Sequence, residues 1–150
     1  MSIYKNRYYV MSLISKIREH SVDFIEKGLA RIGVEDLVVS HGAILSALYR
    51  NNGQLTMNQI SEEIDRSKST VTQLVDRLIE EGYVEKKVSE EDRRYRYIIL
   101  TDKSMEIKED VYKISDHLID IVYKGFSELE EEMFFKMLLK VKDNFEQIEE

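Results

Sequence analysis

The stretch from residue 56 to residue 101 constrains the fold of this chain more than any other. Apolar residues recur there at helical spacing, first around Ile60 and again around Val75. Two segments rich in aromatic and β-branched residues follow, Tyr83–Val88 and Tyr95–Leu100, and this composition is typical of strands. We therefore expect two helices and a β-hairpin in direct succession.

Local signals place the ends of the two helices. The sequence Thr56-Met57-Asn58-Gln59 fits a capping box, in which the threonine and glutamine side chains satisfy backbone donors at a helix start. This helix should stop near Asp65-Arg66. Ser67 should begin the second helix as its N-cap, and Gly82 should end it, because glycine accepts a left-handed conformation. The inward stripe of the second helix follows the helical repeat at Val71, Leu74, Val75, Leu78 and Ile79.

The other face of the second helix carries short hydroxyls, an amide and long cations, which can reach base edges and phosphates from the major groove. An ordinary solvated face is the alternative, and the adjoining hairpin favours a winged helix-turn-helix that reads duplex DNA. Ser67, Ser69 and Thr70 can instead serve as caps, and Asp76 can pair with Arg77 or stay solvated. The predicted contact residues of this helix are Ser67, Lys68, Ser69, Thr70, Thr72, Gln73 and Arg77.

The hairpin tip, Ser89 to Arg94, concentrates arginines between the two strands. An arginine on a narrow hairpin can enter the minor groove, where the electrostatic potential is most negative. A carboxylate near phosphate is repelled, so we expect Asp92 to orient an arginine and not to touch DNA. The predicted wing residues are Asp92, Arg93, Arg94 and Arg96.

The flanking segments are long and helical, which gives a mainly α fold class with a small β-wing. Residues 3–32 predict one helix that ends at Gly28 or Gly33, packed either in the core or on a second subunit. Ser40 looks like the N-cap of the next helix, which should end at Asn51-Asn52-Gly53. Thr101 should begin one long helix that reaches about Gly125.

Heptad spacing in the C-terminal third predicts a helical homodimer interface. Ser127-Glu128-Leu129-Glu130 is a second capping box, which starts the last helix. The two seams consist of Ile107, Val111, Ile114, Leu118 and Ile121, and of Phe134, Leu138, Val141, Phe145 and Ile148.

Charge and composition bound the function. The chain has a net charge of −7, but residues 101–150 hold 7 basic and 14 acidic side chains, so most of the acidity lies outside the DNA-reading segment. Cysteine is absent, which excludes thiolate zinc sites and thiol redox sensing. We see no phosphate-cradling glycine loop or nucleophile motif, and we expect no enzyme activity, no cofactor, no membrane segment and a cytoplasmic location.

The three histidines, His20, His41 and His117, lie on different predicted elements without close ligand spacing, so we assign no metal site. If a metal is bound, His41 and His117 are the first candidates. A ligand-binding pocket is less visible still in the sequence. Its candidate lining residues, none of them assigned because such side chains are more often core, are Tyr8, Phe24, His41, Leu45 and Tyr49.

Over nearly its whole length the chain resembles the MarR-type family of transcription regulators. The motifs that carry the resemblance are Leu55–Ile64, Ser67–Thr72, Leu78–Val84 and Asp92-Arg93-Arg94 with Tyr97–Thr101. The resemblance implies a single domain over residues 1–150, with a DNA-binding winged helix-turn-helix in 36–101 and dimerisation helices in 1–33 and 102–150.

The resemblance also implies function. It predicts a homodimer, acting as a repressor on a pseudo-palindromic operator, whose binding to double-stranded DNA is relieved by a small-molecule effector. It makes Asp92 and Arg94 the wing pair, with Arg94 the foremost minor-groove residue. Two alternatives stay open: a winged-helix protein-interaction module without DNA binding, favoured by the acidic C-terminal third, and a zinc-responsive member of the family.

Overall fold

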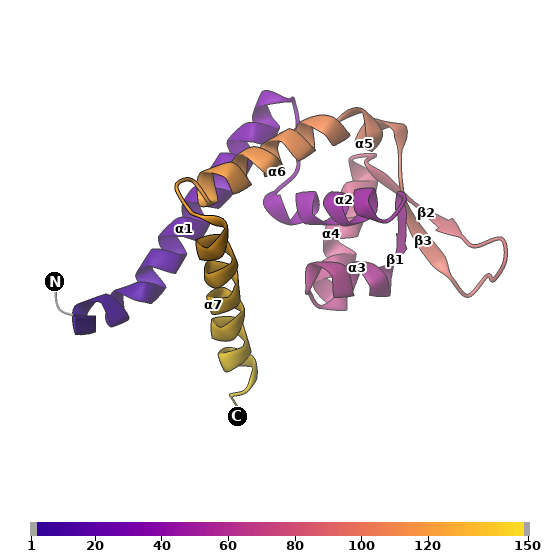
Figure 1. The fold of residues 1–150 in the computed structure, drawn as a ribbon. Helices are drawn as coiled ribbons and strands as arrows, with labels where there is room; N and C mark the ends of the chain where they lie inside the picture. The colour runs from indigo at the N-terminus through magenta and orange to yellow at the C-terminus, as the bar shows by residue number, and fades with distance from the viewer. Residues whose placement is uncertain (1–2, 149–150) are drawn as a thin grey trace. The chain divides into compact units, whose positions relative to one another are not determined.

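The computed structural model of the chain describes residues 3–148. The chain divides into two compact units, Met1–Ser115 and Asp116–Glu150, and each is described by itself. The elements of the first unit and of the helix that crosses the boundary are α1 (Ile3–Arg31), α2 (Val39–Arg50), β1 (Gln54–Thr56), α3 (Met57–Ile64), α4 (Lys68–Glu80), β2 (Val84–Val88), β3 (Arg96–Leu100), α5 (Asp102–Glu106) and α6 (Lys108–Val122) (Figure 1). The mainly α fold class with a small β-wing is confirmed.

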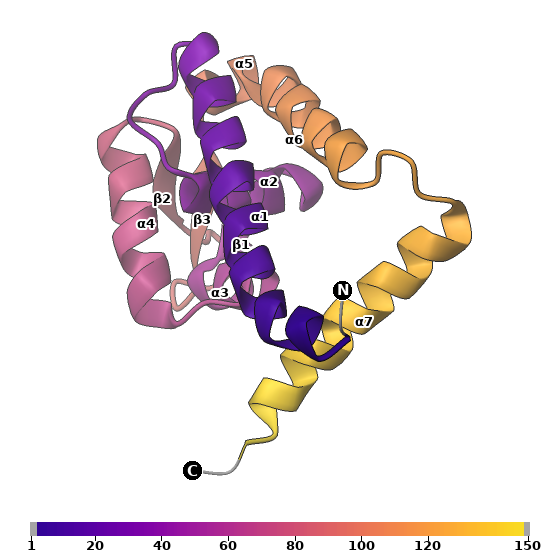
Figure 2. The ribbon, with the colours of Figure 1, turned by 90° about the vertical axis from the view of Figure 1, so that its left-hand side faces the viewer.

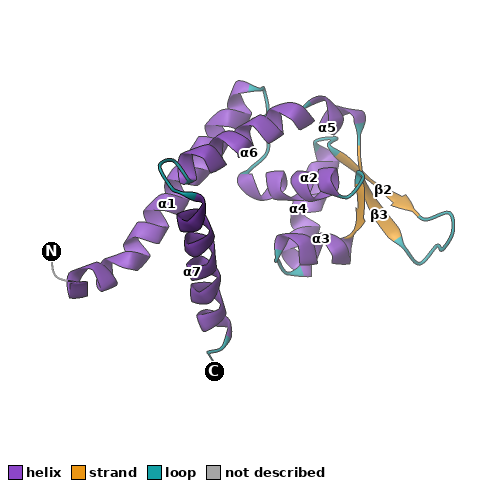
Figure 3. Cartoon of the chain, viewed as in Figure 1, coloured by secondary structure: helices purple, strands orange, loops and turns teal. Residues whose placement is uncertain are grey.

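A small antiparallel sheet in residues 54–100 has the strand order β1-β3-β2 (Figure 3). The register of the hairpin pairs Val84 with Leu100 and Val88 with Arg96. The short strand β1 pairs on the other side of β3, with Leu55 opposite Ile98. The outer part of β2 and β3 extends away from helices α2, α3 and α4, so that the residues between them form a projecting tip (Figure 1).

The core of the first unit lies between α2, α3, α4 and the inner face of the sheet. Its fully buried side chains come from the predicted helical stripes and from the centre of β3. Burying each of the larger aliphatic side chains contributes roughly 1.5–3 kcal/mol. The largest of them are Ile44, Leu45, Leu48, Ile60, Val71, Val75, Leu78 and Ile98.

The predicted caps of the DNA-reading segment are confirmed. Thr56 N donates to Gln59 Oε1 at 2.9 Å, and Gln59 N donates to Thr56 Oγ1 at 3.3 Å. Gly82 terminates α4 one position beyond the C-cap residue Glu81, with a φ of +77°. Tyr83 N then donates to Leu78 O and Gly82 N to Ile79 O, which is the Schellman closure of a helix C-terminus.

The predicted N-cap at Ser40 is wrong. Helix α2 begins at Val39, and its N-cap residue is Val38, which has no polar side chain. The side chain of His41 replaces the missing cap: its Nδ1 accepts a hydrogen bond from Val38 N at 3.0 Å. A sequence search for a hydroxyl cap cannot find this start, because the acceptor reaches back from the third helical position.

The predicted single helix from Thr101 to about Gly125 is also wrong, since α5 and α6 are separated at Ile107. In a continuous α-helix the carbonyl of Ser104 would accept from the amide of Lys108. Here the Tyr49 hydroxyl donates to Ser104 O at 2.5 Å. This buried bond lies next to the break between the two helices. The Thr101 hydroxyl does not cap α5; it donates to Gly82 O at 2.6 Å.

The first predicted heptad seam is divided between two environments. Val111 is buried in the core of the first unit. Ile114 packs against that core and lies so close to Gly28 of α1 that an added Cβ there would stand 3.0 Å from Ile114 Cγ2. Ile121, in the second unit, is about half exposed. The N-terminal part of this seam therefore stabilises the chain internally.

The second unit contains the end of α6 and helix α7 (Glu128–Glu146), shown from a second direction in Figure 2. The predicted capping box at Ser127 is confirmed. Glu130 N donates to Ser127 Oγ, and Ser127 N donates to Glu130 Oε2. Tyr123, Phe126 and Phe134 form an edge-to-face cluster with ring centroids 5.7–6.3 Å apart. Most other apolar side chains of α7 are exposed to solvent.

Candidate nucleic-acid interface

The N-terminal turn of α4 is ordered by its own hydroxyl groups. Thr70 N donates to Ser67 Oγ at 3.3 Å, and the Ser67 and Thr70 hydroxyl oxygens lie 3.0 Å apart. Thr72 Oγ1 donates to Lys68 O at 2.8 Å. Ser67 is therefore the cap of α4, as its position predicts, and these three hydroxyls hold the turn that would face a DNA groove.

The remaining polar residues of this turn are available to a ligand. Lys68, Ser69 and Gln73 are exposed, and their side chains make no hydrogen bond or ion pair with other residues in the range 3–148. Lys68 carries a full positive charge at the helix N-terminus, where the helix dipole also attracts anions. Figure 2 shows the end of α4 that follows α3 lying beside α3.

Arg77 occupies a different environment from the other predicted contact residues. It lies in the last turn of α4, and its guanidinium contacts Glu80 at 3.4 Å and Glu81 at 2.7 Å. Two carboxylates thus offset its charge within the protein. Asp76 does not pair with Arg77; its carboxylate accepts from Lys86 Nζ of β2 at 3.1 Å. This ion pair links α4 to β2, and the sequence does not reveal it because its partners belong to separate elements.

The wing tip is a hydrogen-bonded loop. Ser89 Oγ accepts from the amides of Glu91 and Asp92 at 3.3 Å each. Ser89 N donates to Tyr95 O at 2.9 Å, and Tyr95 N donates to Asp92 O at 3.0 Å. These bonds close residues 89–95 into a compact turn and fix the backbone from which the arginines extend.

Asp92 and Arg94 form the ion pair that the sequence predicts for the wing. Arg94 Nη2 lies 2.7 Å from Asp92 Oδ2, and Arg94 Nε lies 3.1 Å from both carboxylate oxygens. The Arg94 amide also donates to Asp92 Oδ1 at 3.0 Å. These side-chain and backbone hydrogen bonds from Arg94 lower the pKa of Asp92. The Arg94 side chain nevertheless remains 87% exposed, so its guanidinium is both oriented and accessible.

Arg93 and Arg96 add two further exposed cations to the tip. Within residues 3–148 neither side chain forms an ion pair with a carboxylate. Three guanidinium groups therefore lie within four consecutive residues, on a hairpin that extends from the helical body (Figure 1). The neighbouring Tyr95 is about half exposed between them. The chemistry of this tip suits phosphate and the floor of a minor groove.

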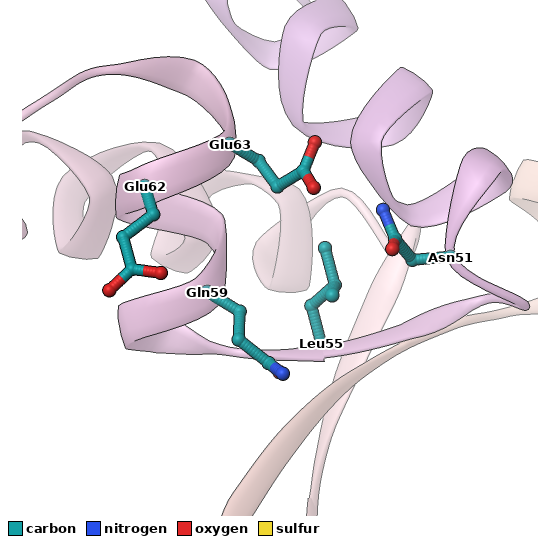
Figure 4. A pocket seen from close by; sticks show the side chains of 5 residues that line it. All are labelled: Asn51, Leu55, Gln59, Glu62 and Glu63. Atoms are coloured by element: carbon teal, nitrogen blue, oxygen red, sulfur yellow. The ribbon is translucent and has the colours of Figure 1, made fainter.

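A wide cavity of the first unit lies outside the candidate interface, beside α3 and β1. It measures about 520 Å³ and is lined by Asn51, Leu55, Gln59, Glu62 and Glu63 (Figure 4). Glu63 also pairs with Arg50 at 3.7 Å, and Gln59 is engaged in the cap of α3. Two carboxylates at its rim make this hollow unsuitable for phosphate, so it does not extend the candidate interface.

A smaller and mainly apolar cavity lies between α1, α2 and α6. It measures about 210 Å³, and its lining residues are Ile25, Leu29, Val39, Gly42, Ala43, Ser46, Val111, Ile114 and Ser115. The five effector candidates named from the sequence do not line it. Leu45 and Tyr49 are buried in the core, and Tyr8 is 90% exposed. The candidates taken from the sequence are large apolar or amphipathic side chains, whereas the cavity is lined on α2 by the small residues Gly42, Ala43 and Ser46.

The histidines are distributed as the sequence predicts, with His20 on α1, His41 on α2 and His117 on α6. His41 is buried, and burial together with the charge of Arg77 lowers its pKa. Its Nδ1 is already engaged with Val38 N. Among the described residues, no group of three histidine, aspartate or glutamate side chains is placed to hold a metal ion. The helices between residues 3 and 148 also include none that is long and apolar enough to cross a membrane.

Comparisons with known proteins agree with this geometry. The model of the MarR family matches residues 33–94. The chain is 30% identical over 113 residues to the HTH-type transcriptional regulator BilQ of Clostridioides difficile, and the match covers 75% of this chain and 76% of that protein.

Solved structures share the fold. A mutant of MarR from E. coli complexed with operator DNA superposes with a TM-score of 0.74 at 18% identity, over 94% of this chain and 99% of that one. The organohalide-sensing regulator RdhR-CbdbA1625, bound to 2,4-dichlorophenol, gives a TM-score of 0.78 at 16% identity, over 96% and 85% of the two chains.

Proposed function

This chain belongs to the MarR family of transcriptional regulators, and from that premise we propose that it is a homodimeric repressor whose binding to a pseudo-palindromic operator is relieved by a small apolar effector. The operator-bound E. coli relative supports a DNA duplex as the ligand. A dimer seated on an operator represses by excluding other proteins from the same DNA.

We assign base and phosphate contacts to the N-terminal turns of α4. Lys68, Ser69 and Gln73 are the primary contact residues, because their side chains are exposed and unpaired within the described chain. Ser67, Thr70 and Thr72 hold this turn in place and can present hydroxyls to phosphate. Arg77, whose charge is offset by Glu80 and Glu81, has a smaller share in phosphate binding.

We assign the minor-groove contact to the wing. The observation that carries this assignment is the Asp92–Arg94 fork, which orients an exposed guanidinium at the end of a projecting hairpin. Arg93 and Arg96 supply additional charge toward the sugar-phosphate backbone. Asp92 positions Arg94 and does not itself contact DNA, since its carboxylate would be repelled by phosphate.

A homodimer supplies two such readers. The apolar side chains of α7 support this assignment, because Leu129 and Phe145 are each at least 60% exposed in the single chain. A helix with this many exposed apolar residues is typical of an interface. Two readers related by a two-fold axis match a pseudo-palindromic site in which the half-sites lie about one helical turn apart.

The apolar cavity between α1, α2 and α6 is our proposed effector site. Its volume of about 210 Å³ suits a small ligand with one ring, and its mainly apolar lining favours an uncharged, poorly hydrated molecule. The structural neighbour bound to 2,4-dichlorophenol supports this ligand class. Binding there would act on α2 and α6 in the first unit, close to the elements that support α4.

The decisive experiment selects duplexes from a random-sequence pool with the unmodified protein, and then compares Arg94→Ala with Arg18→Ala on the enriched duplex. Arg18 is an exposed arginine of α1, so its removal changes the charge equally. We expect Arg94→Ala to weaken binding by about tenfold, since it removes a charge-assisted contact, and Arg18→Ala to change it little. Failure to enrich any duplex at low salt would contradict DNA reading and favour the protein-interaction alternative.

A further inference from the structure

The C-terminal end of the recognition helix is held by side chains that lie beyond the wing. Lys103 Nζ of α5 donates to Glu81 O at 2.6 Å. Thr101 Oγ1, at the start of α5, donates to Gly82 O at 2.6 Å. These carbonyls follow the last turn of α4, where a helix leaves acceptors without partners inside itself. The end of α4 is thus bonded to α5 at two consecutive residues.

The same contact includes the ring of Tyr83 and a backbone hydrogen bond from Thr101 to Tyr83. Lys103 Nζ stands 4.3 Å from the centroid of the buried Tyr83 ring, within range of a cation–π interaction. Thr101 N donates to Tyr83 O at 3.2 Å. We call the set formed by Glu81, Gly82, Tyr83, Thr101 and Lys103 the α4–α5 contact. Its cation also complements the negative end of the helix dipole.

Helix α5 is itself fixed to the helical body. Ser104 is fully buried, and its carbonyl accepts from the Tyr49 hydroxyl of α2 at 2.5 Å. Ser104 Oγ donates to Thr101 O at 2.7 Å, which closes the first turn of α5. The short helix is therefore anchored to α2 on one side and to the end of α4 on the other.

Because α4 is long, a small tilt at its C-terminal end produces a large displacement of its N-terminal turn. The helix has 13 residues and so spans about 20 Å. A tilt of about 5° at its C-terminus would displace the N-terminal turn by roughly 1.7 Å at that length. Hydrogen bonds to base edges tolerate only a few tenths of an ångström, so the orientation of α4 controls whether its contacts form.

We propose that Lys103, with Thr101, is a positioning residue for the recognition helix, which fixes the tilt of α4 and thereby sets discrimination between the operator and other DNA. This inference rests on the proposed DNA-reading function. Lys103 does not act as a phosphate ligand, because its ammonium is occupied by Glu81 O and the Tyr83 ring at the end of α4 remote from Lys68.

The test uses Lys103→Met, Lys103→Arg and Thr101→Val in the full chain. Lys113→Met serves as the matched control, because Lys113 is an exposed lysine of α6 that pairs with Asp110. The probes are the duplex enriched from a random pool by the unmodified protein and a poly(dI-dC) competitor. The readouts are the affinity for each probe, the salt dependence of each affinity and the thermal midpoint.

We expect Lys103→Met to lose about tenfold in affinity for the enriched duplex, with unchanged affinity for poly(dI-dC) and an unchanged salt slope. Thr101→Val should lower discrimination in the same direction, Lys103→Arg should restore most of it, and Lys113→Met should behave as the unmodified protein. The thermal midpoints must stay above the assay temperature, and Thr101→Val serves as the second variant if Lys103→Met fails to fold.

Two results would overturn the inference. Equal affinities of Lys103→Met, Thr101→Val and the unmodified protein for the enriched duplex would show that the α4–α5 contact does not position α4. A parallel loss on both probes, with a salt slope reduced by about one, would make Lys103 a phosphate ligand. Both results require that the unmodified protein enriches a duplex, so they are distinguishable from failure of the proposed function itself.

Discussion

The guanidinium of Arg94 and the carboxylate of Asp92 form a two-point ion pair at the wing tip, with Nη2 and Nε of the arginine both donating to the aspartate. The two residues are separated by one position, and the amide of Arg94 donates to the same carboxylate. An exposed long side chain is thus held in one direction without being buried. Such preorganisation lowers the conformational entropy that the arginine loses when it enters a groove.

Neutralising Asp92 tests whether its main effect on DNA affinity is to orient Arg94 or to repel phosphate. Asp92→Asn should weaken binding to the enriched duplex by about threefold, because the fork that orders Arg94 is lost although a negative charge is also removed. Glu91→Gln is the matched control, since it removes one exposed charge from the same tip. It should leave affinity unchanged or slightly higher. Equal gains in affinity for both variants, measured by fluorescence anisotropy, would mean that Asp92 only repels DNA.

Removing the Tyr49 hydroxyl should destabilise the protein. Tyr49→Phe leaves the buried Ser104 carbonyl without its donor, which costs about 1–3 kcal/mol of unfolding free energy. The measurement is urea denaturation followed by circular dichroism. Tyr112→Phe is the control, because the ring of Tyr112 packs on Tyr49 at a centroid distance of 5.7 Å while the Ser104 bond stays intact. A loss no larger than that of the control would contradict a stabilising role for the bond between Tyr49 and Ser104.

Burial and the charge of Arg77 lower the pKa of His41, which makes stability depend on pH. The unfolded chain binds the proton near pH 6.5, whereas the folded chain binds it only at lower pH. The free energy of unfolding should therefore be highest above about pH 7 and should fall as the pH drops through 6.5 toward the folded pKa. Protonation would also remove the acceptor of Val38 N.

His41→Gln isolates this effect, since a glutamine at the third helical position can accept the same amide bond without titrating there. The decline in urea stability between pH 7 and pH 5.5 should be smaller in His41→Gln than in the unmodified protein. His20→Gln, on the exposed face of α1, is the control and should retain the full decline. Identical pH profiles for all three proteins would rule out His41 as the source.

A charge on the apolar face of α7 should separate the proposed dimer. Leu138→Glu places a carboxylate among apolar residues, which costs several kcal/mol if they are buried against a partner. We expect a shift from dimer to monomer in sedimentation equilibrium at micromolar concentration, accompanied by loss of operator binding. Lys140→Glu, at an exposed polar position two residues away, should leave the mass unchanged. A monomeric unmodified protein would contradict the homodimer proposal directly.

Sequence alone predicted the parts of this protein that depend on near neighbours. The capping boxes at Thr56 and Ser127 and the Asp92–Arg94 pair each join residues two or three positions apart. Such contacts form within one turn, so residue identity and spacing suffice to predict them. The order of helices and strands followed from hydrophobic periodicity for the same reason. The prediction of Ser40 as an N-cap is wrong because the His41 side chain accepts the hydrogen bond that a hydroxyl usually accepts.

Only the tertiary structure decided how these local parts hold one another. Lys86 reaches Asp76 across 10 residues, Lys103 reaches Glu81 O across 22, and Tyr49 reaches Ser104 O across 55. The last of these bonds lies next to Ile107, where α5 and α6 separate and where the predicted heptad seam begins. Periodicity predicts which face of a helix is apolar. It cannot predict that a distant hydroxyl donates to a backbone carbonyl, because the two groups meet only once the core has packed.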